Sequence, residues 1–287
     1  MDYKFYSPGK VIKTIATILI LSTLGCGAAK IESPKTEHLE ASLISEVTGI
    51  QPGIPFWVGL KLKMEEGWHV NWKNPGDAGL APSIKWELPE GFTAGEIQWP
   101  IPERLLVSEF VLFGYEGTVL LPVEITPPAT IENEKFSITA SCDWVVCGEV
   151  CVPGEAKLSL ELLVKQSTNL VDSKWASEFA STRDRLPDAY SVCGVSATAT
   201  DSIIIIEYLP TVLEFPSFDS MVFFPEEQGI INNAAYQKLT KTGNNYRLEI
   251  KRDKLVRNLP KTMYGIIAFK SETFPSWTKG IYTAFVF

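Results

Sequence analysis

The chain has 287 residues, of which 45% are hydrophobic and 21% are charged, a composition typical of a folded globular protein rather than a disordered or collagen-like one. Five cysteines are too few for a small disulfide-stapled scaffold, and a net charge of −8 gives no basic surface for nucleic acid. The histidines are His38 and His69 alone, which excludes catalysis or a metal centre that requires several of them.

The N-terminus has the features of an export signal. Lys4, Lys10 and Lys13 precede an uncharged run, Thr14–Leu24. As a helix this run would extend only ~16 Å, well short of the ~30 Å hydrocarbon core of a bilayer. A basic segment followed by a short apolar one and then small residues predicts a secretory signal peptide over residues 1–25.

The residues that follow the apolar run, Leu24-Gly25-Cys26-Gly27, resemble a bacterial lipobox, although Thr23 occupies a position that is usually leucine. We therefore expect a periplasmic lipoprotein that is anchored to the membrane through Cys26. Ordinary cleavage after Ala28 or Ala29 is the alternative. In either case the remaining cysteines face an oxidising compartment, where disulfides form.

Short runs of β-forming residues, separated by Pro and Gly, make up most of the remaining chain. Their alternation of apolar and polar residues is typical of half-buried antiparallel strands. After a polar linker at 26–38, this pattern predicts an immunoglobulin-like β-sandwich over 39–166. The predicted strands are Ala41–Val47, Phe56–Met64, Trp68–Trp72, Ile84–Leu88, Glu96–Trp99, Val119–Ile125, Phe136–Val146 and Ala156–Val164.

One segment, Val171–Leu186, has its apolar residues at helical spacing. Asp172 or Ser173 can cap its start, and Pro187 closes it, so we expect a helix that links two domains. The fold class is therefore all-β, with this helix and a second, smaller β domain making up residues 167–287. The strands predicted there are Ser202–Tyr208, Met221–Phe224, Tyr246–Lys251, Met263–Phe269 and Ile281–Phe287.

The residues most suited to chemistry are Cys147 and Cys151. In a continuous strand their Cα atoms would lie ~13 Å apart, whereas a disulfide needs about 4.4–6.8 Å. Because Gly148 allows a tight turn, the two cysteines can face each other across a hairpin at roughly 4.5–5.5 Å, which predicts a bond between them. A loop this short gains little stability from closure, so the bond fits a redox couple as well as a structural bridge.

A metal site is a third interpretation of the cysteines. It would use Cys142, Cys147 and Cys151 with His69, but the spacing lacks the paired short intervals of zinc sites. No lysine or arginine lies between Thr139 and Ala156. Nearby acidic residues disfavour a thiolate, so we expect a thiol pKa that is normal or raised and exchange that depends on a docked partner.

Three motifs occur in a distinctive order. They are Gly67–Leu80 (GWHVNWKNPGDAGL), Ile97–Arg104 (IQWPIPER) and Phe113–Val123 (FGYEGTVLLPV), and they are followed by Cys147–Pro153. Together they resemble the N-terminal periplasmic domain of DsbD-type thiol:disulfide interchange proteins, including the branch linked to suppression of copper sensitivity. The resemblance covers residues 40–165 well and the second half more loosely.

The resemblance implies an immunoglobulin-like fold without a cofactor. It also implies that Cys147 and Cys151 form a redox pair that takes electrons from a membrane-embedded domain and passes them to thioredoxin-like periplasmic proteins, with Cys151 forming the mixed disulfide. Phe110, Phe113 and Tyr115 fall in the stretch that resembles the family's cap loop, which shields the pair. Phe113 is our choice for the cap, and a place in the sandwich core is the alternative for each of the three.

The sequence also departs from the family pattern. It ends at Phe287 without a membrane-spanning or thioredoxin domain, so we expect a separate membrane-embedded electron donor. Cys142 and Cys193 are additional to the pair. We expect Cys142 to point to the opposite strand face from Cys147 and Cys193 to be a buried small residue, with a Cys142–Cys193 bridge as the alternative.

The function expected from the sequence is thus thiol–disulfide exchange through Cys147 and Cys151. The protein would be one component of a protein-disulfide reductase system, in cytochrome c biogenesis or copper tolerance. The alternative is a non-redox binding module of the envelope, in which the same bond is structural.

Overall fold

The computed structural model describes residues 35–165, 173–188, 194–210, 218–256, 258–270 and 279–287. The predicted signal peptide, Cys26 and Cys193 lie outside these residues. Contacts group Ser33–Phe287 into one compact unit. Among the described residues, no helix has both the length and the hydrophobicity needed to cross a bilayer.

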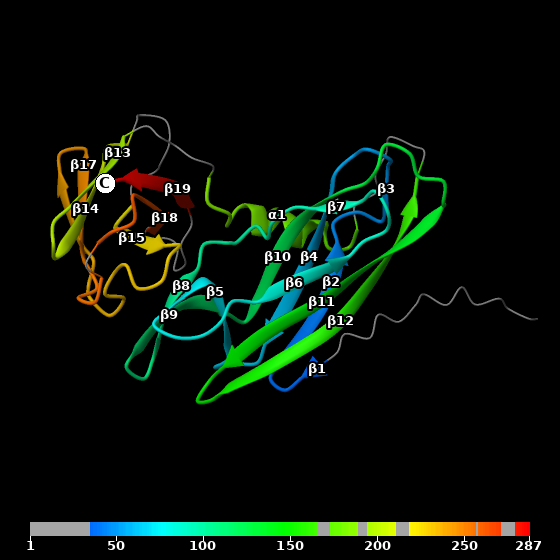
Figure 1. Cartoon of the computed structure of the whole chain (residues 1–287), viewed down its shortest axis with the longest axis horizontal. Coiled ribbons are helices and arrows are strands. Elements are labelled where there is room, and N and C mark those ends of the chain that lie inside the picture. Colours follow the sequence, from blue (N-terminus) through cyan, green and yellow to red (C-terminus); the bar gives the residue numbers. More distant parts are fainter. Residues whose placement is uncertain (1–34, 166–172, 189–193, 211–217, 257, 271–278) are drawn as a thin grey trace, which may run out of the picture. The chain divides into compact units, whose positions relative to one another are not determined.

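Two antiparallel-rich sheets form the predicted sandwich (Figure 1). The five-stranded sheet has the order β1 (Lys35–Thr36), β2 (Leu39–Ser45), β4 (Phe56–Met64), β10 (Thr118–Thr126) and β7 (Thr93–Ala94). The seven-stranded sheet has the order β3 (Gly49–Ile50), β12 (Cys151–Val164), β11 (Lys135–Cys147), β5 (His69–Gly76), β9 (Phe110–Glu116) and β8 (Glu103–Val107), and β6 (Ser83–Glu87) also pairs with β11. The sequence-based prediction of an immunoglobulin-like all-β fold is confirmed.

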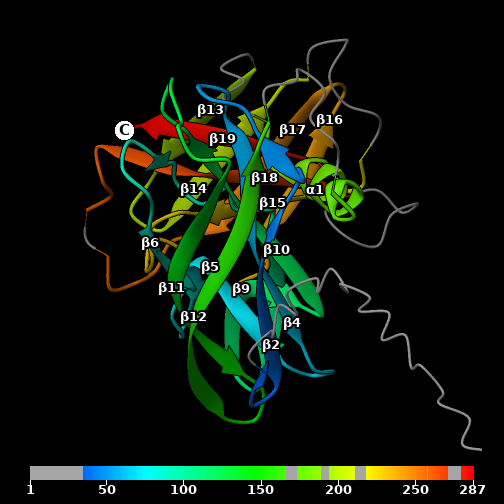
Figure 2. The ribbon, with the colours of Figure 1, turned by 90° about the vertical axis from the view of Figure 1, so that its right-hand side faces the viewer.

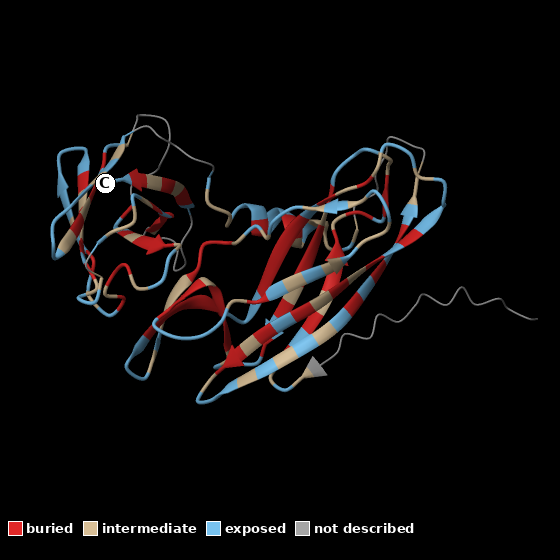
Figure 3. Ribbon diagram, in the orientation of Figure 1, coloured by how far each residue is buried: buried red, intermediate tan, exposed pale blue. Residues whose placement is uncertain are grey.

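The sandwich core follows from the alternation seen in the sequence. On β11 the even-numbered residues from Phe136 to Val146 are buried and belong to one large core cluster, while the odd-numbered residues from Lys135 to Val145 are exposed or partly exposed. Figure 3 shows this alternation as bands of red and pale blue along β11 and β12. Successive side chains of a strand point to opposite faces. Even-numbered residues of β11 therefore face the core, and odd-numbered residues face outward.

The one described helix, α1 (Ala176–Arg183), is shorter than the predicted Val171–Leu186. Ser173 does not cap it: its hydroxyl accepts a hydrogen bond from the Trp175 backbone N–H, which makes a turn before the helix starts. Phe179 is fully buried in a small cluster with residues of β2 and β10. The helix therefore covers the outer face of the five-stranded sheet (Figure 2).

The second half contains two further sheets. One has the order β13 (Val195–Ala199), β14 (Ile203–Tyr208), β17 (Asn245–Lys251) and β16 (Lys238–Thr242). The other has the order β15 (Ser220–Pro225), β18 (Thr262–Lys270) and β19 (Lys279–Val286). Their buried residues form a second core cluster. A domain boundary at 166/167 stays a prediction.

The two cores are joined through β15. Phe224, which belongs to the second half, is fully buried in the sandwich core, and its ring packs edge-on against Trp72 and Phe113. The end of β5 adds polar contacts. The Asn74 amide donates hydrogen bonds to the carbonyls of Pro225 and Glu227, at 2.7 and 3.1 Å. The second half thus holds the end of β5.

One predicted strand is wrong. Residues Glu96–Trp99 form no strand, because single backbone hydrogen bonds, such as that from Gln98 to Pro122, replace a regular ladder. Pro100 and Pro102 follow directly and have no N–H to continue it. The structure also has strands that the pattern did not predict, chiefly β8, β9, β13 and β16.

Candidate redox site

The site lies at the tip of the long β11–β12 hairpin. These strands pair in register along their whole length, down to Cys147 opposite Cys151. Residues 148–150 form the turn, closed by a 2.9 Å hydrogen bond from the Gly148 N–H to the Val150 carbonyl. The predicted bond is present: the Cys147 and Cys151 sulfurs are 2.05 Å apart and the Cα atoms 4.1 Å apart.

A tryptophan packs against this turn. A Cβ atom added to Gly148 would lie 3.1 Å from the Trp68 ring, so the indole rests directly on the glycine backbone. The Trp68 ring also stacks on His38, with centroids 3.7 Å apart. Gly148 is therefore needed for close packing as well as for the turn.

The two sulfurs differ sharply in exposure. Cys147 is 3% exposed, whereas Cys151 is an exposed residue at the start of β12. A molecule approaching from solvent therefore reaches Cys151 first. If the bond opens there, the sulfur left behind is the buried one.

Cys147 lies in a row of side chains that crosses four strands. It is the register partner of Cys151 on β12 and of His69 on β5, and His69 is in turn the partner of Glu116 on β9. Directly opposed residues of antiparallel strands point to the same face, with Cβ atoms about 4.5–5.5 Å apart. Val146, Val70 and Tyr115, the adjacent row, belong to the sandwich core. The row Cys151–Cys147–His69–Glu116 therefore lies on the outer face.

His69 is buried in spite of its place on this face. It is 2% exposed, and its Nε2 atom has no hydrogen-bond partner among the described residues. Burial lowers the pKa of His69 below its ordinary value of 6.5, and the charge of Glu116 opposes that shift to a smaller extent. His69 is thus a neutral imidazole at pH 7. His69 lies at the start of β5, within the strand predicted over Trp68–Trp72, and its Nε2 atom is not satisfied.

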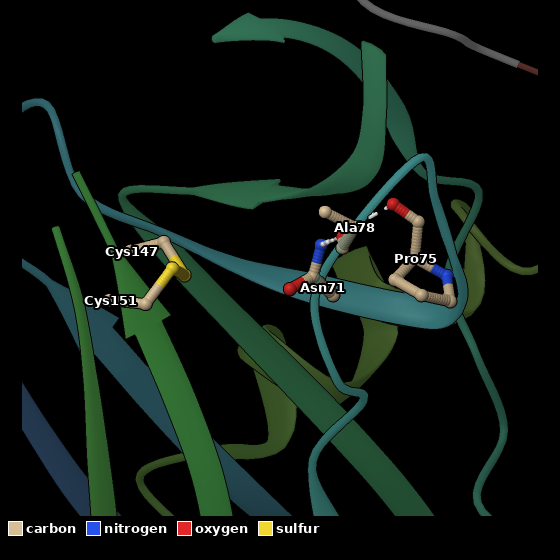
Figure 4. Close-up of a disulfide and its surroundings, with 5 residues drawn as sticks. All are labelled: Asn71, Pro75, Ala78, Cys147 and Cys151. Carbon is tan, nitrogen blue, oxygen red and sulfur yellow. Dashed lines mark hydrogen bonds between the residues drawn. A yellow bond between two sulfur atoms is a disulfide. The ribbon is translucent and has the colours of Figure 1, made fainter. Parts of the chain in front are cut away.

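A neighbouring turn covers the next residue of this face. Asn71 is fully buried, and its amide lies 3.5 Å from the carbonyl oxygens of Pro75 and Ala78 (Figure 4). A Cβ added to Gly79 would come 2.2 Å from the Asn71 Oδ1 atom, so only glycine lets the chain pass this close. The loop after β5 therefore lies over the strand beside the disulfide.

A groove of about 610 Å³ opens on the same face of the hairpin. Its apolar lining includes Val145 and Pro153, a register pair two residues from the cysteines, and Leu80. Leu80 is 66% exposed. Asp143 and Glu155 also line the groove, so its lining is apolar with two carboxylates.

Cys142 is separate from this site. It lies on the core face of β11, 1% exposed, and carries a free thiol. Burial, with a smaller contribution from Asp143, raises the pKa of this thiol to about 12. The opposite orientation of Cys142 and Cys147 is as predicted. This orientation keeps Cys142 from the metal site considered with Cys147, Cys151 and His69. Cys193 lies outside the described residues, so the alternative of a bridge to it stays untested.

The aromatic residues predicted to shield the pair lie in different environments. Phe110 is 46% exposed at the start of β9. Phe113 is fully buried in the core against Phe224, and the Tyr115 hydroxyl donates a 2.7 Å hydrogen bond to the Pro100 carbonyl. None of the three shares the row with Cys147, where β9 contributes Glu116 instead. A capping role for any of them stays a prediction.

Three comparisons place the chain among known proteins. Residues 42–163 match the family described as "Thiol:disulfide interchange protein DsbD, N-terminal". The structure is similar to the crystal structure of the N-terminal periplasmic domain of ScsB from Proteus mirabilis, with a TM-score of 0.62 and 15% sequence identity, over 88% of this chain and 95% of that chain. At that identity the likeness concerns the fold alone.

A protein of unknown function from Porphyromonas gingivalis W83 aligns over 88% of this chain and 100% of its own, with 11% identity and a TM-score of 0.23, which is too low to indicate a shared fold. No curated protein is significantly similar in sequence.

Proposed function

Since residues 42–163 form a domain of the DsbD N-terminal type, we propose that this protein relays reducing equivalents between proteins through the Cys147–Cys151 pair. Thioredoxin-like proteins of the periplasm are the proposed partners, and a separate membrane-embedded protein is the proposed electron donor. The proposed process is cytochrome c biogenesis or copper tolerance. The identity of the thioredoxin-like partner determines which of the two it is.

The observation that carries this proposal is the unequal exposure of the two sulfurs. A partner thiolate can attack the exposed Cys151 sulfur, which forms a mixed disulfide and releases Cys147 as a thiolate or thiol. The partner's second cysteine then attacks its own sulfur in this mixed disulfide and leaves the pair reduced. In the opposite direction the reduced Cys151 forms a mixed disulfide with an oxidised partner. The buried Cys147, held next to that bond by the hairpin register, then attacks Cys151 and releases the reduced partner. This assigns exchange to Cys151 and resolution to Cys147.

The groove beside the pair is the proposed docking surface. Its apolar lining residues Val145 and Pro153 lie two register positions from the disulfide, and Asp143 and Glu155 give it negative charge. These features favour a partner that is apolar around its own cysteine and basic near it. Glutathione is too small to need such a surface. Comparing the reaction of Cys151 with glutathione and with a protein partner therefore separates the effect of docking from that of the exchange chemistry.

We further propose a periplasmic location with a lipid anchor on Cys26. This rests on the sequence, since Cys26 lies outside the described residues. Replacing Cys26 with alanine should then move the protein from the membrane fraction to the soluble fraction of the envelope. Unchanged partition between the two fractions would argue against lipidation at this residue.

A redox titration tests the exchange function. The protein is equilibrated with mixtures of reduced and oxidised glutathione, quenched in acid, alkylated under denaturing conditions and weighed by mass spectrometry. We expect Cys147 and Cys151 to gain or lose two electrons together within the range that glutathione covers, while Cys142 stays reduced throughout as an internal control. Structural disulfides have potentials below about −300 mV. A pair that stays oxidised in every mixture would therefore favour the binding-module alternative.

A further inference from the structure

The row of side chains at the hairpin tip places a histidine beside the buried cysteine. His69 and Cys147 are register partners on adjacent strands and point to the same face. Both are almost completely buried, at 2% and 3% exposure. The only other histidine, His38, stacks on Trp68 and bonds to Glu65, away from this row.

The state of His69 fits the oxidised form of the pair. Its Nε2 atom is buried without a partner, an arrangement that costs free energy. In a disulfide neither sulfur carries a hydrogen, so Cys147 offers no donor to this nitrogen. When the bond is reduced, Cys147 regains an S–H, which is a donor directly across the strand pair.

From this geometry we propose that His69 is the proton acceptor for Cys147 in the exchange reaction, a role that rests on the proposed function. When Cys151 is joined to a partner, the Cys147 S–H gives its proton to His69 Nε2. The Cys147 thiolate then attacks the Cys151 sulfur. The bond between Cys151 and the partner sulfur breaks, and the partner leaves as a thiolate that takes up a proton.

The step balances in atoms and electrons. The Cys147 sulfur passes from the thiol to the disulfide level, the departing partner sulfur passes from the disulfide to the thiol level, and Cys151 stays in a disulfide. The proton from Cys147 ends on the partner or in solvent. Over the whole exchange the pair gives two electrons to the partner. In the opposite direction the same imidazole, once protonated, returns the proton to Cys147 as it leaves. A buried thiol needs such a group because burial disfavours its thiolate and no lysine or arginine lies between Thr139 and Ala156.

The charges around His69 are compatible with this role. Glu116, its register partner on β9, is exposed at the far end of the row. Its carboxylate favours the protonated imidazole, and burial disfavours it more strongly. On the β11 side the facing titratable group is Cys147, and the turn beyond carries Glu149. His69 is therefore neutral when it must accept a proton, and Glu116 supports the charge that it then carries.

The test follows the reaction of reduced protein with oxidised glutathione, quenched in acid and read by intact mass. In the parent, the glutathione adduct on Cys151 should be short-lived because Cys147 resolves it. In His69→Gln the adduct should form at the parent rate but resolve at least ~10-fold more slowly at about pH 7, since general bases contribute typically ~10²–10⁴-fold. At about pH 10 the difference should disappear, because hydroxide then deprotonates Cys147.

His38→Asn is the matched control. It removes the chain's other imidazole at a position with φ 62°, which asparagine tolerates, and should resolve the adduct at the parent rate. Equal resolution rates in His69→Gln and the parent would overturn the role of His69 alone. A parent protein that does not react with oxidised glutathione at all would instead contradict the proposed function.

The parent protein gives an independent measurement if His69→Gln does not fold. With His69 as acceptor, the resolution rate should be level from about pH 7 to pH 8 and should fall at lower pH, below the ordinary histidine pKa of 6.5, as the imidazole becomes protonated. A rate that instead rises about tenfold per pH unit throughout this range would show that hydroxide removes the proton. That result would overturn the proposal.

Discussion

Replacing Cys147 with serine is expected to turn a transient mixed disulfide into a stable one. The partner remains bonded to the exposed Cys151, because the buried sulfur that would displace it is absent. The variant should accumulate a covalent complex with a thioredoxin-like protein that survives denaturation and disappears with reductant. Non-reducing electrophoresis of envelope extracts, followed by mass spectrometry of the trapped protein, measures this and identifies the partner.

The controls for this experiment follow from where the other cysteines lie. Cys151→Ser should trap much less, since Cys147 is only 3% exposed. Cys142→Ala should behave like the parent, because its thiol lies on the core face; alanine is preferable to serine there because a buried hydroxyl needs a partner. None of the pair variants should lose much stability, because the bond closes a short loop. A sharp drop in melting temperature without trapping would identify the bond as structural.

The docking groove can be tested in the same Cys147→Ser background. Adding Leu80→Asp places a charge on an exposed apolar side of the groove. It should slow the formation of the complex with a protein partner and leave the reaction of Cys151 with oxidised glutathione unchanged. Equal slowing of both reactions would mean that the change acts on the cysteine itself rather than on docking.

Phe224→Ala is expected to destabilise the sandwich although Phe224 belongs to the second half. The ring is fully buried against Trp72 and Phe113, which lie on the same strands as His69 and Glu116. Removing a buried phenylalanine ring costs about 3–5 kcal/mol of the free energy of unfolding. Urea denaturation measures this loss, and hydrogen exchange should show it as faster exchange in β5 and β9.

The adjacent residue provides a control of equal size. Phe223 is also fully buried, but on the opposite face of β15, in the core of the second half. Phe223→Ala should cost a similar free energy and accelerate exchange first in β14 and β17 rather than in β5 and β9. If both variants open the same strands, or if Phe224→Ala costs less than about 1 kcal/mol, Phe224 does not join the two cores.

Features that depend on neighbouring residues could be predicted from the sequence. The strand Phe56–Met64 has its predicted bounds because its apolar residues alternate with residues that face outward. The Cys147–Cys151 bond was predictable because both cysteines belong to one tight hairpin. In each case the signal lies within a few residues, so tertiary packing does not alter it.

Features that depend on distant strands could not be predicted in the same way. β9 was missed as a strand because five successive residues, from Val111 to Tyr115, are buried, which removes the alternation. The alignment of Cys147, His69 and Glu116 depends on the register between β11, β5 and β9, which no local pattern specifies. The only available signal was the presence of a histidine within the predicted strand Trp68–Trp72.

The long hairpin also has an edge that could pair with another sheet. Among the described residues β12 is covered by β11 on one side, and on the other it pairs with β3 only at Leu163 and Val164. An open edge beside a reactive sulfur invites strand addition and aggregation. Pro153 cannot donate a backbone hydrogen bond, and exposed charges at Glu155, Lys157 and Glu161 continue along the strand. These residues disfavour strand addition at the β12 edge by a partner protein. A partner therefore reaches Cys151 across the face of the sheet and can dissociate after the exchange.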